Sequence, residues 1–244
     1  MKVAKQLGAA CVAGMMCVGT ANALALLDSS MYPAITGDPD GNVTVGGVNF
    51  DANGAPGAKF IVGSNGGSSG LGVTGGPTNT EIDIFETITM SWSYFAAVED
   101  FTLALLYNGP EFGDVREVAQ VSASFDKGDN TIGTIVGTLT VAPLEDDVAI
   151  WSIFSGDSPA VNQSFAIEAG GGAWLVTNPF GNLSVNRLVF TALLNPTCGS
   201  GSCYNQSDYV LSSVNVVPEP GTYSLLLAGL AAVGFIARRR RIPN

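Results

Sequence analysis

Histidine is absent from all 244 residues, and this absence removes the commonest general base of nucleophilic catalysis. A Ser-His-Asp triad or a Cys-His pair therefore does not fit the sequence. Cysteine is scarce as well, with four residues, so a zinc site of the usual Cys and His composition is not predicted. No Gly-rich stretch opens a helix in the pattern of a nucleotide-binding loop. The sequence thus predicts a protein that is not an enzyme.

Positive charge is the other scarce property. Between Leu24 and Val217 only four side chains are basic and twenty are acidic, which gives this segment a formal charge of −16. Nucleic-acid binding needs clustered Lys and Arg, so no nucleic-acid partner is predicted. An excess of carboxylates favours solubility, or oxygen-rich sites for a hard cation such as calcium.

The N-terminal segment has the three parts of a secretory signal peptide. Its start is positively charged, residues 7–20 are apolar, and Ala21 and Ala23 form a small-x-small cleavage site. We therefore expect residues 1–23 to be a signal peptide that is removed on export. A short buried helix is the alternative interpretation of this segment.

Strand patterns separated by turn-forming residues recur through the middle of the chain. In ETITMSWSY (Glu86–Tyr94) apolar and hydroxyl side chains alternate, which indicates a half-buried strand. FTLALLY (Phe101–Tyr107) is expected to be the next strand, and Val43–Phe50 an earlier, shorter one. No stretch inside this domain has a persuasive helical period. Residues 24–217 are therefore predicted to form one all-β domain, a β-sandwich or jelly roll of about nine to eleven strands.

Two cysteines remain after the signal peptide, both in the segment CGSGSC. Their close spacing in an exported chain predicts a disulfide between Cys198 and Cys203. On the chain-entropy account a ring this small contributes about 2 kcal/mol. The disulfide would therefore fix a loop rather than hold the fold together.

Three acidic residues precede the clearest strand: Glu81, Asp83 and Glu86. We interpret them first as a solvated acidic edge, which discourages association between sheets. Calcium binding is the second interpretation, because carboxylate oxygens are the ligands that calcium prefers. A glycosidase-type pair of carboxylates is the third.

The tryptophans raise a similar choice between binding and packing. An exposed row of aromatic rings could form a platform on which sugars stack. Each tryptophan, however, has apolar neighbours within a strand pattern, and large aromatic side chains of this kind usually pack in the core. We therefore expect all three to be core residues: Trp92, Trp151 and Trp174.

The C-terminal segment combines three features in a fixed order. Pro218-Glu219-Pro220 ends the last strand, because proline lacks the N–H that a sheet requires. Thr222–Ala237 is almost entirely apolar and as a helix would span about 24 Å, against about 30 Å for a bilayer core. By the positive-inside rule, four arginines then hold the C-terminus in the cytoplasm: Arg238, Arg239, Arg240 and Arg241.

This order of motif, apolar helix and basic cluster resembles the PEP-CTERM sorting signal of exported proteins in Gram-negative bacteria. The resemblance implies recognition by an exosortase, a membrane transpeptidase-like enzyme that cuts near the PEP motif and releases the protein or transfers it to the surface. Residues 218–220 would then be the recognition triad and residues 238–241 the stop-transfer cluster. An ordinary C-terminal membrane anchor is the alternative. Proteins with this signal often accompany exopolysaccharide and biofilm production.

The domain itself resembles jelly-roll surface domains that bind calcium or carbohydrate, through GLGV (Gly70–Val73), EIDIFETITMSWS (Glu81–Ser93) and the closing YVLSSVNVVPEP. We therefore expect a non-enzymatic protein, exported through an inner-membrane intermediate to the cell surface or extracellular matrix. Its expected role is structural or adhesive, linked to exopolysaccharide, and the alternative is a calcium-dependent carbohydrate-binding module. The expected partners are the exosortase and secretion machinery through the termini, and extracellular polysaccharide. Calcium is the one cofactor considered.

Overall fold

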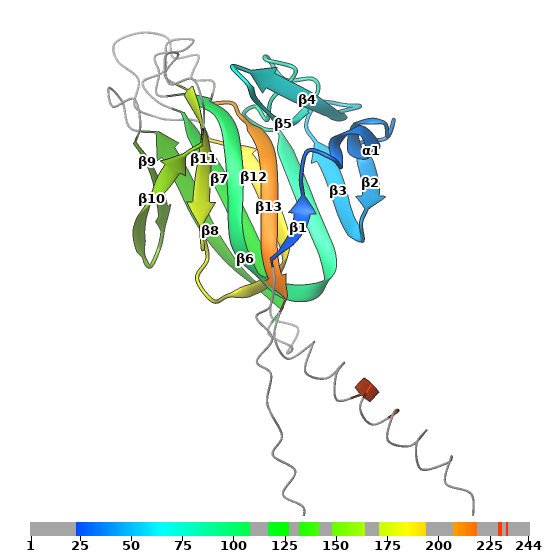
Figure 1. Cartoon of the computed structure of the whole chain (residues 1–244). Coiled ribbons are helices and arrows are strands. Elements are labelled where there is room, and N and C mark those ends of the chain that lie inside the picture. The colour runs from blue at the N-terminus through cyan, green and yellow to red at the C-terminus, as the bar shows by residue number, and fades with distance from the viewer. Residues whose placement is uncertain are drawn as a thin grey trace, which may run out of the picture.

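The computed structural model describes residues 23–107, 117–126, 132–141, 148–163, 171–193 and 207–218, together with Gly229, Leu230 and Val233. Within these ranges the chain forms one sheet of thirteen strands and one short helix (Figure 1). The prediction of an all-β domain is therefore confirmed. In chain order the elements are β1 (Leu24–Leu27), α1 (Tyr32–Thr36), β2 (Asn42–Val45), β3 (Val48–Asn53), β4 (Phe60–Asn65), β5 (Ser68–Val73), β6 (Thr87–Tyr107), β7 (Val118–Asp126), β8 (Ile132–Val141), β9 (Ala149–Ile153), β10 (Gly156–Asn162), β11 (Gly171–Thr177), β12 (Ser184–Ala192) and β13 (Val210–Pro218).

Seven of these strands form a closed barrel. β6 pairs with β12, the ladder continues through β7, β8, β9, β10 and β11, and β11 pairs back onto β6. The first half of β6 faces β12, with Met90 opposite Leu188, and its second half faces β11, with Phe101 opposite Val176. The predicted β-sandwich or jelly roll of two sheets is corrected here to a single sheet closed on itself, because one long strand pairs on both sides.

The length of β6 was not expected from its sequence. The two strands predicted at Glu86–Tyr94 and Phe101–Tyr107 are parts of one strand of 21 residues. Its ladder with β12 shifts register between Val185 and Arg187, and its ladder with β13 shifts between Asn215 and Val216. Such bulges bend a strand and increase its twist, which lets β6 turn from one side of the barrel to the other.

The remaining strands cover one side of the barrel, together with α1 (Figure 1). β13 pairs with β6 and also with β1 and β5, whereas β3 pairs with the first half of β6. The strand predicted at Val43–Phe50 is in fact the hairpin β2–β3. Its turn is Gly46-Gly47, and both glycines have positive φ (61° and 84°), as a two-residue hairpin turn requires.

Large aromatic side chains fill the barrel. Phe101 contacts Trp151 edge to face with ring centroids 5.2 Å apart, and it contacts Phe190 in the same way at 5.9 Å. Trp151 contacts Phe180 at 5.7 Å. These rings come from β6, β9, β12 and the segment before β12, so one aromatic cluster links strands that are far apart in the sequence.

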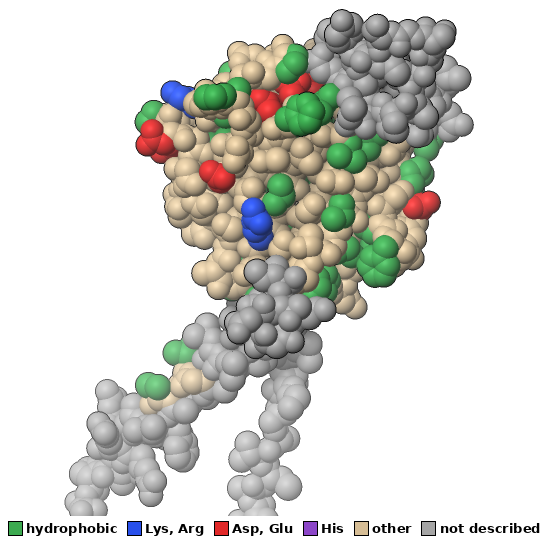
Figure 2. Space-filling view, turned by 180° about the vertical axis from the view of Figure 1, so that it is seen from behind, with side chains coloured by type: hydrophobic (Ala, Val, Ile, Leu, Met, Phe, Trp, Pro, Cys, Tyr) green, Lys and Arg blue, Asp and Glu red, His purple; other side chains and the backbone are tan. Residues whose placement is uncertain are grey.

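Short hydroxyl side chains dominate the outer surface of β6, β12 and β7. Ser91 of β6 lies opposite Arg187 of β12, which lies opposite Ser124 of β7, and the next row places Thr89 and Ser122 on either side of β12. Charged side chains are accordingly sparse on this part of the surface, as Figure 2 shows from behind. This part of the barrel wall is thus polar but nearly uncharged.

Candidate functional site

Two of the predicted site residues meet in a buried turn immediately before β6. Asp83 is fully buried and Glu86 is 2% exposed. The backbone N–H of Asp83 donates to Oε2 of Glu86 at 3.0 Å, and the N–H of Glu86 donates to the carbonyl of Asp83 at 3.0 Å. Thr78 donates to Oδ2 of Asp83 through its N–H at 3.2 Å and its hydroxyl at 2.9 Å. The interpretation as a solvated edge is therefore wrong for these two residues.

Glycines on neighbouring segments make room for this pair. A Cβ atom on Gly76 would lie 2.0 Å from Oδ2 of Asp83, and a Cβ atom on Gly54 would lie 3.2 Å from Oε1 of Glu86. The first distance is far shorter than any tolerated contact, so the carboxylate of Asp83 occupies the space that a side chain at position 76 would fill. The pocket around the acidic pair therefore depends on residues outside the acidic motif.

The electrostatics of the pair oppose its full ionisation. Burial raises the pKa of Glu86, and the nearby charge of Asp83 raises it further, while hydrogen bonds from the backbone of Asp83 and Gly76 act in the opposite direction. Oε1 of Glu86 is buried and has no hydrogen-bond partner among the described residues. A proton or a bound cation on the Glu86 carboxylate would offset the cost of burying its charge beside Asp83, and it would give Oε1 a partner.

Glu81 does not complete a three-carboxylate site with this pair. It lies outside any strand and is partly exposed, and its carbonyl accepts a hydrogen bond from the N–H of Val73 at 3.0 Å. Within the described ranges no three Asp, Glu, His or Cys side chains are grouped closely enough to hold a metal ion. The residues present thus offer calcium two buried carboxylates, Asp83 and Glu86, rather than the predicted three.

The tryptophans lie in the core, as predicted. Trp92, Trp151 and Trp174 are all buried. Trp151 Nε1 donates to the carbonyl of Pro179 at 2.8 Å, and Trp174 Nε1 donates to the carbonyl of Leu106 at 3.0 Å. None of the three therefore offers an exposed face on which a sugar could stack.

Two exposed phenylalanines were missed by the sequence interpretation. Phe85, between the two acidic residues, is 90% exposed and has a φ of +71°, which is rare for a residue with a side chain. Phe154, at the turn between β9 and β10, is 89% exposed. Both phenylalanines lie in turns rather than in strands, and the turn places each ring in solvent.

The last strand leads directly into the C-terminal motif. Pro218 is the final residue of β13, lies opposite Ala96 of β6 and is buried. The other predicted sorting residues, Glu219, Pro220 and 238–241, lie outside the described residues, as do Cys198, Cys203, Ala21 and most of residues 1–23. Ala23 is described and exposed, next to β1.

The predicted membrane helix at Thr222–Ala237 is described at three positions. Gly229, Leu230 and Val233 are helical and exposed. Among the described residues no helix is both long enough and apolar enough to cross a membrane.

Comparison with known protein families gives a match at the C-terminus. Residues 216–241 match the family model of the PEP-CTERM protein-sorting motif. The chain is thus an exported all-β protein with a C-terminal sorting signal. More particularly, it carries the PEP-CTERM signal of an exosortase substrate, which implies a membrane-anchored intermediate before processing. Neither the curated proteins nor the solved structures gave a match to the chain.

Proposed function

We propose that this chain is a non-enzymatic protein of the cell surface or extracellular matrix, with a structural or adhesive role beside exopolysaccharide. The observation that carries the proposal is the sorting motif at residues 216–241. The absence of histidine and the burial of Asp83 and Glu86 support a role in binding or assembly rather than catalysis, because a catalytic carboxylate must reach its substrate. Exosortase, the secretion machinery and extracellular polysaccharide are the partners in this proposal.

Fractionation of cells that express a tagged chain tests the sorting step. The unaltered chain is expected at the surface or in the medium, with an intact mass that lacks the signal peptide and the tail. Replacement of residues 238–241 by glutamine should leave the chain untrimmed, because the basic stop-transfer cluster is lost.

A matched control removes positive charge from the domain instead of the tail. Lys59→Gln and Arg187→Gln change exposed basic residues, and this variant should be delivered and trimmed normally. Normal delivery of the chain without residues 218–244, or normal trimming of the variant with glutamine at 238–241, would refute the sorting function.

A calcium-dependent carbohydrate-binding module is the second candidate, and the buried acidic pair favours its calcium component. Asp83 and Glu86 would hold the ion, and the ion would supply the positive charge that this acidic domain lacks at that point. Calcium at a hundred times its Kd would stabilise the fold by about 2.7 kcal/mol.

Thermal unfolding with calcium, with magnesium and with a chelator tests this candidate. Calcium should raise the Tm of the unaltered chain and of Glu99→Gln, which changes an exposed carboxylate elsewhere on the domain. It should not raise the Tm of Glu86→Gln. Equal responses of the two variants would place any calcium away from the acidic pair.

A further inference from the structure

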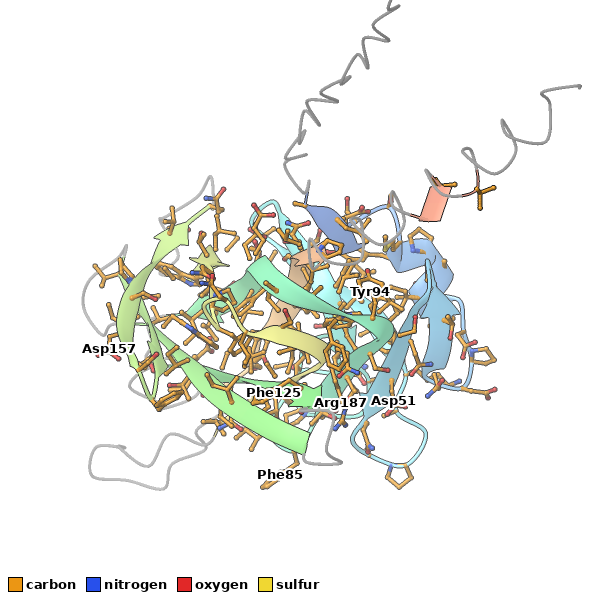
Figure 3. All side chains as sticks on the ribbon, turned by 90° about the horizontal axis from the view of Figure 1, so that it is seen from below. Asp51, Phe85, Tyr94, Phe125, Asp157 and Arg187 are labelled. Carbon is orange, nitrogen blue, oxygen red and sulfur yellow. The ribbon has the colours of Figure 1, made fainter. Side chains whose placement is uncertain are left out.

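A groove of about 780 Å³ lies at the end of the barrel from which the sorting motif departs. It is lined by residues of β7, of β8, of the β9–β10 hairpin and of the segment before β12, among them Phe125, Phe154, Phe180, Ser155, Asp157 and Asn178. Figure 3 views the barrel from below and labels two of these residues, Phe125 and Asp157. Openings at the ends of barrels are common ligand sites, and this volume suits a molecule of several hundred daltons.

Its position follows from strand register. Leu183, which lines the groove, directly precedes Ser184, and Ser184 lies opposite Ala97 of β6. Pro218 lies opposite the neighbouring Ala96. The groove and the start of the sorting tail therefore share one end of the barrel.

Two aromatic rings of the groove are fixed by the residues behind them. The ring of Phe125 lies against Gly133 of β8, where a Cβ atom would come within 2.2 Å of it. Phe180 packs edge to face on Trp151, which is itself held by the hydrogen bond to Pro179. These rings need little ordering when a ligand binds, which favours affinity.

Phe154 adds a third ring, at the tip of the β9–β10 hairpin. An aromatic side chain that is 89% exposed gains little from folding, because most of its apolar surface stays in water. A ligand that covers Phe154 would remove this apolar surface from water, and the resulting hydrophobic stabilisation would contribute to binding. Phe154 is thus the lining residue whose removal should affect binding most and folding least.

The groove combines an apolar floor with a polar rim that carries one carboxylate, Asp157, and no basic side chain among its described lining residues. Ser155, Ser158 and Asn178 offer hydroxyl and amide groups, and Asp157 offers a hydrogen-bond acceptor. No lysine or arginine is among its described lining residues, so a phosphate, carboxylate or uronic acid would meet no opposite charge there. A simple acyl chain could not form hydrogen bonds with the polar groups of the rim.

A neutral saccharide can match both the apolar floor and the polar rim of the groove. One face of a sugar ring presents polarised C–H groups, which are attracted to the negative face of an aromatic ring, and its edge presents hydroxyl groups. We propose that the groove binds a neutral polysaccharide segment, with its C–H face on Phe154 and its hydroxyls on Asp157 and the rim. This inference rests on the proposed function and names the binding site that an exopolysaccharide partner would occupy.

Calorimetric titration of the full chain in nanodiscs with cellohexaose, a neutral hexasaccharide, tests the site. We expect binding by the unaltered chain and about tenfold weaker binding by Phe154→Ala and by Asp157→Ala. Phe85→Ala is the matched control, because Phe85 is equally exposed but lies at the other end of the barrel. Phe85 comes just before Thr87, which pairs with the opposite end of β12 from Ser184. This variant should bind as the unaltered chain does.

Three outcomes would overturn the inference. They are an absence of cellohexaose binding, tighter binding of a hexagalacturonate than of cellohexaose, and a retained lipid in native mass spectrometry that Phe154→Ala loses. Because nanodiscs bypass export, failure of this titration leaves the fractionation result intact, and a sorting failure leaves this titration interpretable.

Discussion

The indole of Trp151 packs directly over Gly137 of β8, and this contact gives a sharp stability prediction. A Cβ atom at position 137 would lie 2.1 Å from Cζ2 and 2.4 Å from Cη2 of that ring. Trp151 is 1% exposed, donates to Pro179 and contacts Phe101, so it cannot move, even toward the groove that it borders, without weakening these contacts. Gly137→Ala should therefore displace the indole and weaken both its hydrogen bond to Pro179 and its contact with Phe101.

The expected size follows from those contacts. Weakening the hydrogen bond to Pro179 costs about 1 kcal/mol. Displacing the aromatic contact with Phe101 costs about 1 kcal/mol, and strain in a close-packed interior adds about as much again. We expect Gly137→Ala to lower the free energy of unfolding by about 3 kcal/mol and the Tm by about 9 °C for a domain of this size.

Urea and thermal unfolding, followed by circular dichroism, measure this change within a double-mutant cycle. Trp151→Phe lacks the ring atoms that the new Cβ would meet, so adding Gly137→Ala to it should cost at least 1 kcal/mol less than adding it to the unaltered chain. Thr138→Ala on the same strand should change stability by about 0.5 kcal/mol or less. Strict additivity of the two substitutions, or a negligible effect of Gly137→Ala, would refute this account of the barrel interior.

Three further predictions concern single features. Because its folded-state pKa is raised, Glu86 binds more protons in the folded than in the unfolded protein, so stability should fall as pH rises from the ordinary carboxyl value through that raised pKa. Glu86→Gln should flatten this slope in urea titrations across pH, and an unchanged slope would argue against burial of the carboxyl. Phe85→Gly should raise the free energy of unfolding by about 1 kcal/mol by relieving the positive φ, and a loss of stability would mean that the ring packs on something. Alkylation without reductant should leave Cys198 and Cys203 unmodified in the intact mass, and modification of both would exclude the disulfide.

Local alternation was enough to predict strands and their inward faces. Val121 and Leu139 each lie between polar neighbours in the sequence, and both are buried. A period of two is set by backbone geometry alone, so it can be recognised without knowing which strands pair. The same local geometry explains why the tryptophans could be assigned to the core.

Closure of the barrel could not be predicted in this way. It depends on the pairing of β6 with β11, in which Phe101 lies opposite Val176, and alternation contains no information about a partner 75 positions away. The long β6 also looked like two strands, because the bend near Ala96 interrupts the apolar pattern without ending the ladder.

The candidate sites depended on distant segments as well. The acidic motif could be recognised in the sequence, but its burial depends on Gly54 and Gly76, which lie in separate loops. Likewise, the groove is assembled from strands and turns between Phe125 and Leu183, none of which carries a recognisable motif. In contrast, the sorting signal is contiguous, and for that reason its recognition needed no tertiary structure.

The pairing of β1 with β13 has a consequence for maturation. Leu24, the first residue of β1, lies opposite Val216, so the two ends of the folded domain are about 5 Å apart. Removal of a leader before Leu24 and a cut after Pro218 would both fall just outside the paired residues. The two cleavages could then occur in either order without disrupting the strand pairing of the sheet. The new N-terminus and the new C-terminus of the mature protein would lie next to each other at one end of the barrel.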